Sequence, residues 1–185
     1  FSKVKLVYGV RVEKTDMFYT GENNTGTETY IDRNTLDAFN VLPSLNAVYE
    51  LNDKMNLRFA ANRTVARPTF KEKSIAQIYD PITKRTFVGN IELEQTNINN
   101  VDLRYEFYLS PKELISVATF YKGFDGHIEM VSFPTAPDNI KPRNSGQAIV
   151  YGAEFEVRKS LGNPQDTNSI MGKFFISTNL SLVQS

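Results

Sequence analysis

The sequence predicts an all-β protein in which about seven long strands follow one another as an antiparallel meander. Three observations predict this fold class. Apolar and polar side chains alternate over segments of about ten residues, the connections between these segments alternate between long and short, and almost no segment has the i, i+3, i+4, i+7 spacing of a helix. Because successive side chains of a strand point to opposite faces, the alternation gives each strand one apolar and one polar face.

The strands are expected where the alternation is continuous. In residues 3–14, valine, leucine and tyrosine alternate with lysine, arginine and glutamate, and residues 98–109 repeat the pattern with aromatic residues added. The same alternation defines further strands at residues 44–51, 55–64, 147–159 and 173–184. Residues 114–124 have the composition of a strand, with two less distinct faces. These lengths approach the roughly 9 to 11 residues of a membrane-spanning strand and exceed the usual length of about 5 to 6 in globular proteins.

The connections predict that the two ends of the sheet differ. Long connections are expected at residues 15–40, 65–97 and 126–146, short ones at 52–54 and 110–113, and one of intermediate length at 160–172. Loops longer than about 12 to 15 residues are uncommon in compact domains, whereas outer-membrane barrels combine short periplasmic turns with long extracellular loops. A short helix is an alternative for residues 70–78 inside the second long connection. A soluble β-sandwich is the alternative fold, although its loops are expected to be shorter and more even.

Composition excludes several classes of function. The chain has 21 basic and 21 acidic side chains and no cysteine, so no disulfide framework, thiolate metal site or cysteine nucleophile is available. The basic residues are scattered and form no patch for nucleic acid. No apolar run approaches the roughly 20 residues of a membrane helix, and no N-terminal signal segment is recognisable. Because the chain begins and ends within expected strands, we expect residues 1–185 to be part of a larger barrel.

Four stretches, residues 42–68, 89–106, 114–122 and 144–159, resemble the barrel of TonB-dependent receptors in the form common in Bacteroidetes-type bacteria. Together they cover about two-thirds of the chain in the family's order. The residues that carry the resemblance, all expected to be structural, are Pro43, Asn46, Arg63, Arg67, Pro68, Gly89, Asn90, Asn100, Gly146, Tyr151, Gly152 and Glu154. The chain departs from the family where Ile91 and Gln95 stand in place of frequent prolines, and it contains no tryptophan.

The resemblance implies a partial wall of a transmembrane barrel of about 22 strands with a plugged lumen. It also implies a bacterial outer-membrane location and a role in nutrient uptake. The implied partners are outer-membrane lipid, the rest of the barrel and its plug, TonB and its motor proteins, and a surface lipoprotein that would cover the loops. The chain contains no counterpart of the plug domain, and the resemblance implies no cofactor.

Candidate chemical sites favour a non-enzymatic interpretation. His127 is the only histidine and has no clustered ligand residues nearby in sequence, so we interpret it as a polar residue at a loop edge rather than a metal ligand or base. Asp102 shares a strand face with Glu106, and Glu154 with Glu156. Such pairs can perform glycosidase chemistry, but arginines on the same faces favour mixed charge lining a lumen.

Two further sets of loop residues have open interpretations. Arg63 and Arg67 precede a long connection and would contact either an anionic ligand or lumen carboxylates and loop carbonyls, of which we favour the second. The loops also contain aromatic residues that would stack on sugars or pack the loops against one another: Tyr30, Phe39, Phe70, Tyr79, Phe87 and Phe133. Two alternative functions therefore remain, a structural subunit of an outer-membrane complex and a soluble glycan-binding sandwich.

Overall fold

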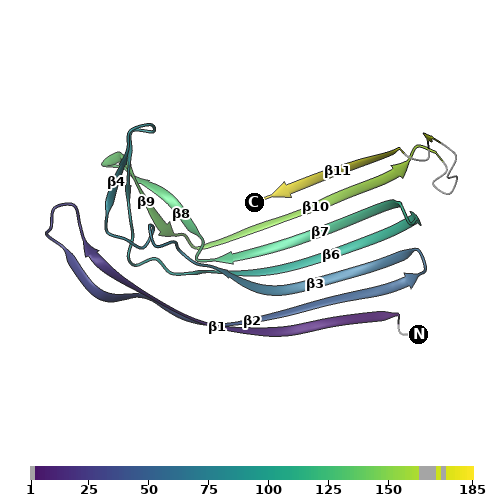
Figure 1. The fold of residues 1–185 in the computed structure, drawn as a ribbon, viewed down its shortest axis with the longest axis horizontal. Helices are drawn as coiled ribbons and strands as arrows, with labels where there is room; N and C mark the ends of the chain where they lie inside the picture. The colour runs from purple at the N-terminus through teal and green to yellow at the C-terminus, as the bar shows by residue number, and fades with distance from the viewer. Residues whose placement is uncertain (1–2, 163–169, 172–173) are drawn as a thin grey trace.

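The computed structural model describes residues 3–162, 170–171 and 174–185. Seven strands form one antiparallel sheet, in the order β1-β2-β3-β6-β7-β10-β11. Their bounds are β1 Val4–Glu22, β2 Thr29–Asn52, β3 Met55–Ala66, β6 Thr96–Ser110, β7 Glu113–Asp125, β10 Gln147–Ser160 and β11 Phe175–Gln184. Each strand pairs with the next strand of the sheet in sequence, as in a meander (Figure 1). The predicted all-β class and the seven-stranded antiparallel meander are thereby confirmed.

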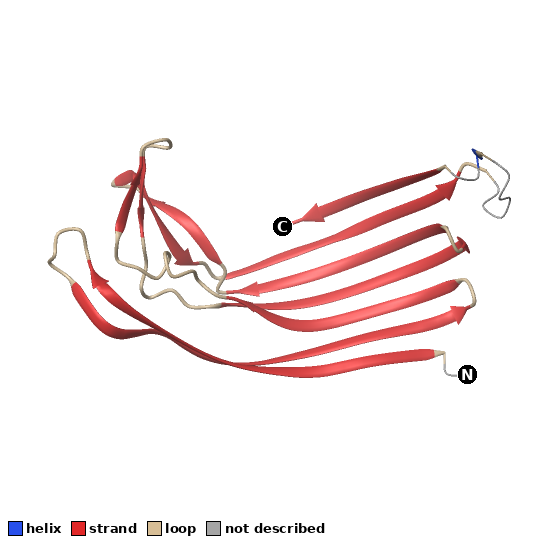
Figure 2. Cartoon of the chain, viewed as in Figure 1, coloured by secondary structure: helices blue, strands red, loops and turns tan. Residues whose placement is uncertain are grey.

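The predicted short connections lie together at one end of this sheet (Figure 2). The turn between β2 and β3 is closed by the side chain of Asn52, whose Oδ1 accepts a hydrogen bond of 2.9 Å from the backbone N–H of Lys54. Asparagine is favoured in such turns because its side chain can replace a backbone acceptor. The predicted connection at residues 160–172 lies largely outside the described residues, as does residue 173 at the start of the last predicted strand.

The prediction of a long loop at residues 15–40 is wrong, because this region is a hairpin arm formed by the continuation of β1 and β2. Paired residues continue from Thr15 and Ala38 to Glu22 and Thr29, with register shifts near Met17. Along the arm polar and apolar residues share each face, as Thr15 and Met17 do on one and Asp16 and Phe18 on the other, so the alternation that marks a buried face disappears although the pairing persists.

The other two long connections fold into a second sheet, which we call the cap and define as residues 67–95 and 126–146. Its strand order is β4-β5-β9-β8, with bounds β4 Gln77–Asp80, β5 Arg85–Val88, β8 Ile128–Phe133 and β9 Ala136–Asn144. The β5 and β9 strands are parallel, whereas the other two pairs are antiparallel. Figure 1 shows the cap at the end of the wall opposite the short turns.

The short helix considered for residues 70–78 is absent. A single turn forms instead, in which the backbone N–H of Lys73 donates to the carbonyl of Thr69 at 3.0 Å. Thr69 and Glu72 form a reciprocal cap, because the Thr69 N–H donates to Glu72 Oε2 at 2.7 Å and the Glu72 N–H donates to Thr69 Oγ1 at 3.3 Å. The chain enters β4 at Gln77, so the single turn does not continue into a helix.

The wall has an apolar face and a polar face whose exposure is the reverse of a soluble protein. On β6, Leu103 on the apolar face is 44% exposed, whereas Glu106 on the polar face is 6% exposed. No sheet covers the apolar face within the described part of the chain, which argues against the β-sandwich alternative. The buried apolar residues lie at the cap end instead: Leu36, Leu42, Ile91 and Leu93. Among the described residues, no helix is long and apolar enough to cross a membrane.

Candidate functional site

The polar face carries a ladder of alternating charges across β3, β6 and β10, which we call the charge ladder. Glu106 accepts from Arg58 Nε at 2.7 Å and from Arg104 Nε at 3.1 Å. Arg104 also donates to Glu156 at 2.7 Å, and Glu156 lies 3.4 Å from Arg158. The carboxylates are thus shared between guanidinium groups, which offsets much of the cost of removing them from water.

Small residues on β7 allow the charge ladder to cross that strand. Ser116 pairs with both Glu106 and Glu156 in the register of the sheet, and Ala118 pairs with Arg104. Short side chains at these positions leave space above β7 through which Arg104 reaches the carboxylate of Glu156. The ladder therefore depends on four neighbouring strands, with charges on β3, β6 and β10 and small residues on β7, which no single strand sequence reveals.

The carboxylate pairs considered for glycosidase chemistry lie within or beside this ladder. Glu106 and Glu156 each accept hydrogen bonds from arginines. Asp102 and Glu154 also lie on the polar face, where the structure gives their side chains no partner among the described residues. The arrangement matches the interpretation of mixed charge lining a lumen.

Arg63 and Arg67, which lie four residues apart in the sequence motif, have different environments. Arg63 occupies a position of β3 on the apolar face of the wall. It lies opposite Asn99, at the end of that face nearest the cap. Arg67 instead forms an ion pair with Glu13, which also pairs with Arg11. Neighbouring Pro68 is buried. The expected pairing with a carboxylate thus describes Arg67 and not Arg63.

Gly89 and Asn90 hold the first connection of the cap together, and Asn90 also bonds to the second connection. A Cβ atom on Gly89 would lie 2.1 Å from the carbonyl oxygen of Ser74, so only glycine permits this approach. The Asn90 N–H donates to the carbonyl of Glu72 at 2.6 Å, and its side-chain Nδ2 donates to the carbonyl of Pro142 at 3.0 Å. Both residues thus make close contacts with the backbone of the cap.

The remaining signature residues are spread along the wall. Pro43 and Tyr151 lie on the apolar face, opposite Val10 and Tyr121 respectively. Asn46 lies exposed on the polar face, and Asn100 on the same face donates to Asn62 at 2.9 Å.

Gly152 and Gly146 mark two different uses of glycine. A Cβ atom on Gly152 would lie 2.4 Å from the carbonyl oxygen of Leu182 and 2.7 Å from the ring of Phe120, which covers the glycine. The carbonyl of Gly146 accepts the N–H of Gly126 at 3.0 Å, at the base of the β8–β9 hairpin, while a Cβ atom on Gly146 would meet nothing within 4 Å.

His127 contacts a carboxylate and a serine without forming a catalytic arrangement. Its Nε2 lies 2.6 Å from Glu129 Oε1, and Ser145 Oγ donates to Glu129 Oε2 at 2.9 Å. Serine catalysis needs a hydrogen bond between the nucleophile and the histidine base, whereas here the serine bonds to the carboxylate. The hydrogen bond with His127, together with that from Ser145, lowers the pKa of Glu129.

Lys73 is buried in the cap, at 2% exposure. Its Nζ donates to the carbonyl of Leu93, which closes the cap around the lysine stem. Burial lowers the pKa of Lys73, and the charges of Glu92 and Glu94 oppose that shift. Sequence reasoning missed this residue because lysine is usually solvated.

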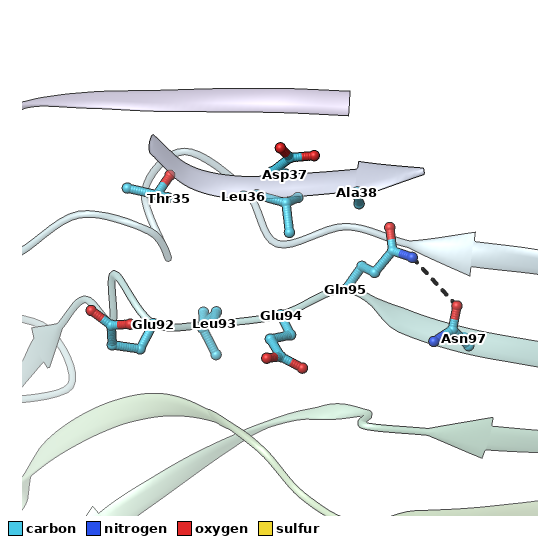
Figure 3. Close-up of a pocket in the computed structure, with 9 residues that line it drawn as sticks. All are labelled: Thr35, Leu36, Asp37, Ala38, Glu92, Leu93, Glu94, Gln95 and Asn97. Carbon is cyan, nitrogen blue, oxygen red and sulfur yellow. Dashed lines mark hydrogen bonds between the residues drawn. The ribbon is translucent and has the colours of Figure 1, made fainter. Parts of the chain in front are cut away.

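A cavity of about 430 Å³ lies where β2 passes the segment leading into β6 (Figure 3). It is lined by Thr35, Leu36, Asp37, Ala38, Glu92, Leu93, Glu94, Gln95 and Asn97. Glu92 is paired with Arg33 at 2.8 Å and Asp37 with Lys14. The lining offers mainly hydrogen-bond acceptors, and no group of residues suited to a metal ion occurs in the described ranges.

The residues that sequence reasoning missed are mostly amides that join distant segments. Asn40 and Gln95 exchange hydrogen bonds of 3.0 and 2.5 Å between β2 and the approach to β6. Asn144 bridges the two connections of the cap through Glu94 and Gly126. In a single sequence, asparagine and glutamine in loops are interpreted as solvated turn residues. The only signal for these amides was that Gln95 and Asn144 lie in resemblance stretches.

The single-layer sheet, the outward apolar face and the charged opposite face define the wall of a transmembrane β-barrel. The sequence model of the family described as "TonB dependent receptor-like, beta-barrel" matches residues 1–182. The chain belongs to this family, whose members are outer-membrane receptors and transporters of Gram-negative bacteria. No curated protein matches the chain in sequence.

Solved structures share this fold at low sequence identity. The siderophore receptor PirA from Pseudomonas aeruginosa matches with a TM-score of 0.66 and 20% identity, over 80% of this chain and 28% of that chain. The ferric enterobactin receptor PfeA, in a complex with BCV-L6, matches with a TM-score of 0.60 and 18% identity, over 80% of this chain and 22% of that chain. The FrpB iron transporter from Neisseria meningitidis matches with a TM-score of 0.62 and 11% identity, over 100% of this chain and 24% of that chain. The chain thus spans roughly a quarter of the length of these relatives. The Bacteroidetes-type form stays a prediction.

Proposed function

We propose that this chain forms part of the barrel wall of a receptor that imports a scarce nutrient through the bacterial outer membrane. The observation that carries the proposal is the reversed exposure of the wall, since apolar side chains are exposed on one face while charges pair on the other. A wall of this kind is stable with lipid on its apolar side and a polar lumen on the other. Residues 1–185 act as wall and loops, and the plug belongs to other parts of the same protein.

Iron complexes are the substrate class that the structural relatives favour. The solved relatives are described as siderophore or ferric enterobactin receptors and as an iron transporter. The cap and hairpin arm lie at the end of the wall where extracellular loops are expected. In this proposal they contact the iron complex before it enters the lumen.

The partners follow from the same proposal. Outer-membrane lipid contacts the apolar face, the plug contacts the polar face, and TonB with its motor proteins supplies energy through the rest of the protein. The signature residues, including Gly89, Asn90 and Gly152, hold the wall and cap together and perform no chemistry. A surface lipoprotein over the loops rests on the sequence resemblance alone.

Uptake measurements test the proposal in cells. The gene is deleted in its host, the host is starved of iron, and the import of radioactive iron offered as a panel of ferric siderophores is compared with wild type. Loss of import of at least one complex, reproduced when TonB is deleted and restored by the intact gene, supports the proposal. Unchanged import with loss of a stable outer-membrane complex would contradict it and favour the structural role.

A further inference from the structure

The two connections of the cap share one sheet. Each contributes a hairpin, β4–β5 from the first and β8–β9 from the second, and the parallel pairing of Thr86 with Asn139 and of Phe87 with Ile140 joins them. An isolated two-stranded hairpin is marginally stable in water. Each hairpin therefore depends on the other for its stability.

Asparagine side chains reinforce this junction. Asn144 accepts from the backbone N–H of Glu94 at 2.8 Å and donates to the carbonyls of Glu94 at 3.0 Å and Gly126 at 2.7 Å. Asn90 donates across the same junction to Pro142 at 3.0 Å. Because these side chains bond backbone groups of both connections, neither connection can move away without losing several hydrogen bonds.

The hairpin arm is attached to the cap in the same way. The side chain of Asn24 at its tip donates to the carbonyl of Gln77 and accepts from the Gln77 N–H, both at 2.9 Å. Gln77 begins β4, an edge strand of the cap sheet, so Asn24 satisfies backbone groups that the edge would otherwise expose. Arg33 on the arm adds an ion pair of 2.8 Å with Glu92.

The cap also has a small core of its own. Lys73 and Leu93 from the first connection and Pro142 from the second are its most deeply buried side chains. A core shared between segments far apart in sequence makes their folding cooperative, because removing one segment exposes the side chains of the other.

We propose that the hairpin arm and both connections of the cap open and close as one cooperative unit rather than as three independent loops. One conformational equilibrium then controls this end of the wall. Any ligand that binds one of the three segments in the closed form stabilises all three. This inference goes beyond the proposed function and holds for a structural subunit as well as for an importer.

Native-state hydrogen exchange in increasing denaturant tests the proposal on the wild-type protein as its cell makes it, in detergent micelles. The amides of β4, β5, β8 and β9, and those of the hairpin arm at residues 15–22 and 29–38, are expected to share one opening free energy and one denaturant dependence, different from those of the rest of the wall. Separate denaturant dependences for β4–β5, for β8–β9 or for the hairpin arm would overturn the proposal. This experiment needs no variant of the protein.

The variant Asn144→Asp adds a directional test, since it removes the two donated hydrogen bonds and retains the acceptor. We expect the protection of β4 and β5 to fall about tenfold, together with that of β8 and β9. The matched control is Asn99→Asp, because Asn99 is exposed beside the cap and its side chain bonds to nothing in the described residues. A fall confined to residues 126–146 would contradict the proposal, and heat-modifiable migration confirms that each barrel is folded.

Discussion

Glu106 is the central acceptor of the charge ladder, and its replacement by alanine tests how much the ladder stabilises the wall. The carboxylate accepts from Arg58 and Arg104, and also from the Tyr108 hydroxyl at 3.0 Å. Removing one partner of a fully buried ion pair costs about 3 to 5 kcal/mol, whereas an exposed pair contributes about 0 to 1 kcal/mol. Because the Arg58 side chain is 46% exposed and regains water, and Arg104 keeps Glu156, we expect Glu106→Ala to cost about 2 kcal/mol.

Urea unfolding of the barrel in detergent, followed by circular dichroism and by heat-modifiable migration, measures this loss. The neutral variant Glu106→Gln retains an acceptor oxygen and is expected to lose about half as much. Glu50→Ala is the matched control, because Glu50 pairs on the same face with Lys5, whose side chain is 70% exposed. Equal unfolding midpoints for Glu106→Ala and Glu50→Ala would refute the view that the ladder holds the three strands together.

Three further predictions concern the cap and its junction with the wall. Gly89→Ala should destabilise the cap by about 2 kcal/mol through a backbone clash, measured as faster proteolysis of residues 67–95, whereas Gly146→Ala should leave that rate unchanged because its site has space. The stability of the cap should rise with pH in the alkaline range below the ordinary lysine pKa of about 10.4. In this range Lys73 keeps its proton when the cap is open, whereas burial in the closed cap lowers its pKa and releases the proton. Lys73→Met should abolish this rise in proteolysis assays run across that range. Arg67→Ala should lower the urea midpoint of the barrel, whereas Arg63→Ala should not, because only Arg67 has an ion-pair partner in the described structure.

The wall was predictable from sequence because the residue pattern of each strand depends on that strand alone. Each strand must present apolar groups to one side, so residues such as Val101 and Leu103 alternate with Asp102 and Arg104 without reference to other strands. The order of the seven strands and the faces of six of them follow from that alternation and from short turns such as Asn52 to Met55. The two faces of β7 are less distinct in the sequence.

The cap and the hairpin arm were not predictable because their stability is non-local. The cap strands are short, and their pairing is fixed by Asn144 and by the close approach at Gly89, both of which act between segments distant in sequence. The arm has polar residues on both faces, so its strands resemble a loop. Arg63 and Arg67 have similar sequence surroundings and the same strand parity, and they differ because β3 ends at Ala66, before Arg67.

Cysteine scanning along β6 tests most directly that this sheet is a membrane wall with lipid on its apolar face. The native chain contains no cysteine, so single substitutions at residues 100–105 can be labelled one at a time in the intact protein in bilayers. Spin labels at Val101, Leu103 and Tyr105 should be accessible to oxygen dissolved in lipid, and labels at Asn100, Asp102 and Arg104 to a water-soluble relaxation agent. An alternation of opposite phase, or equal water access at all six positions, would contradict the assignment of the apolar face to lipid.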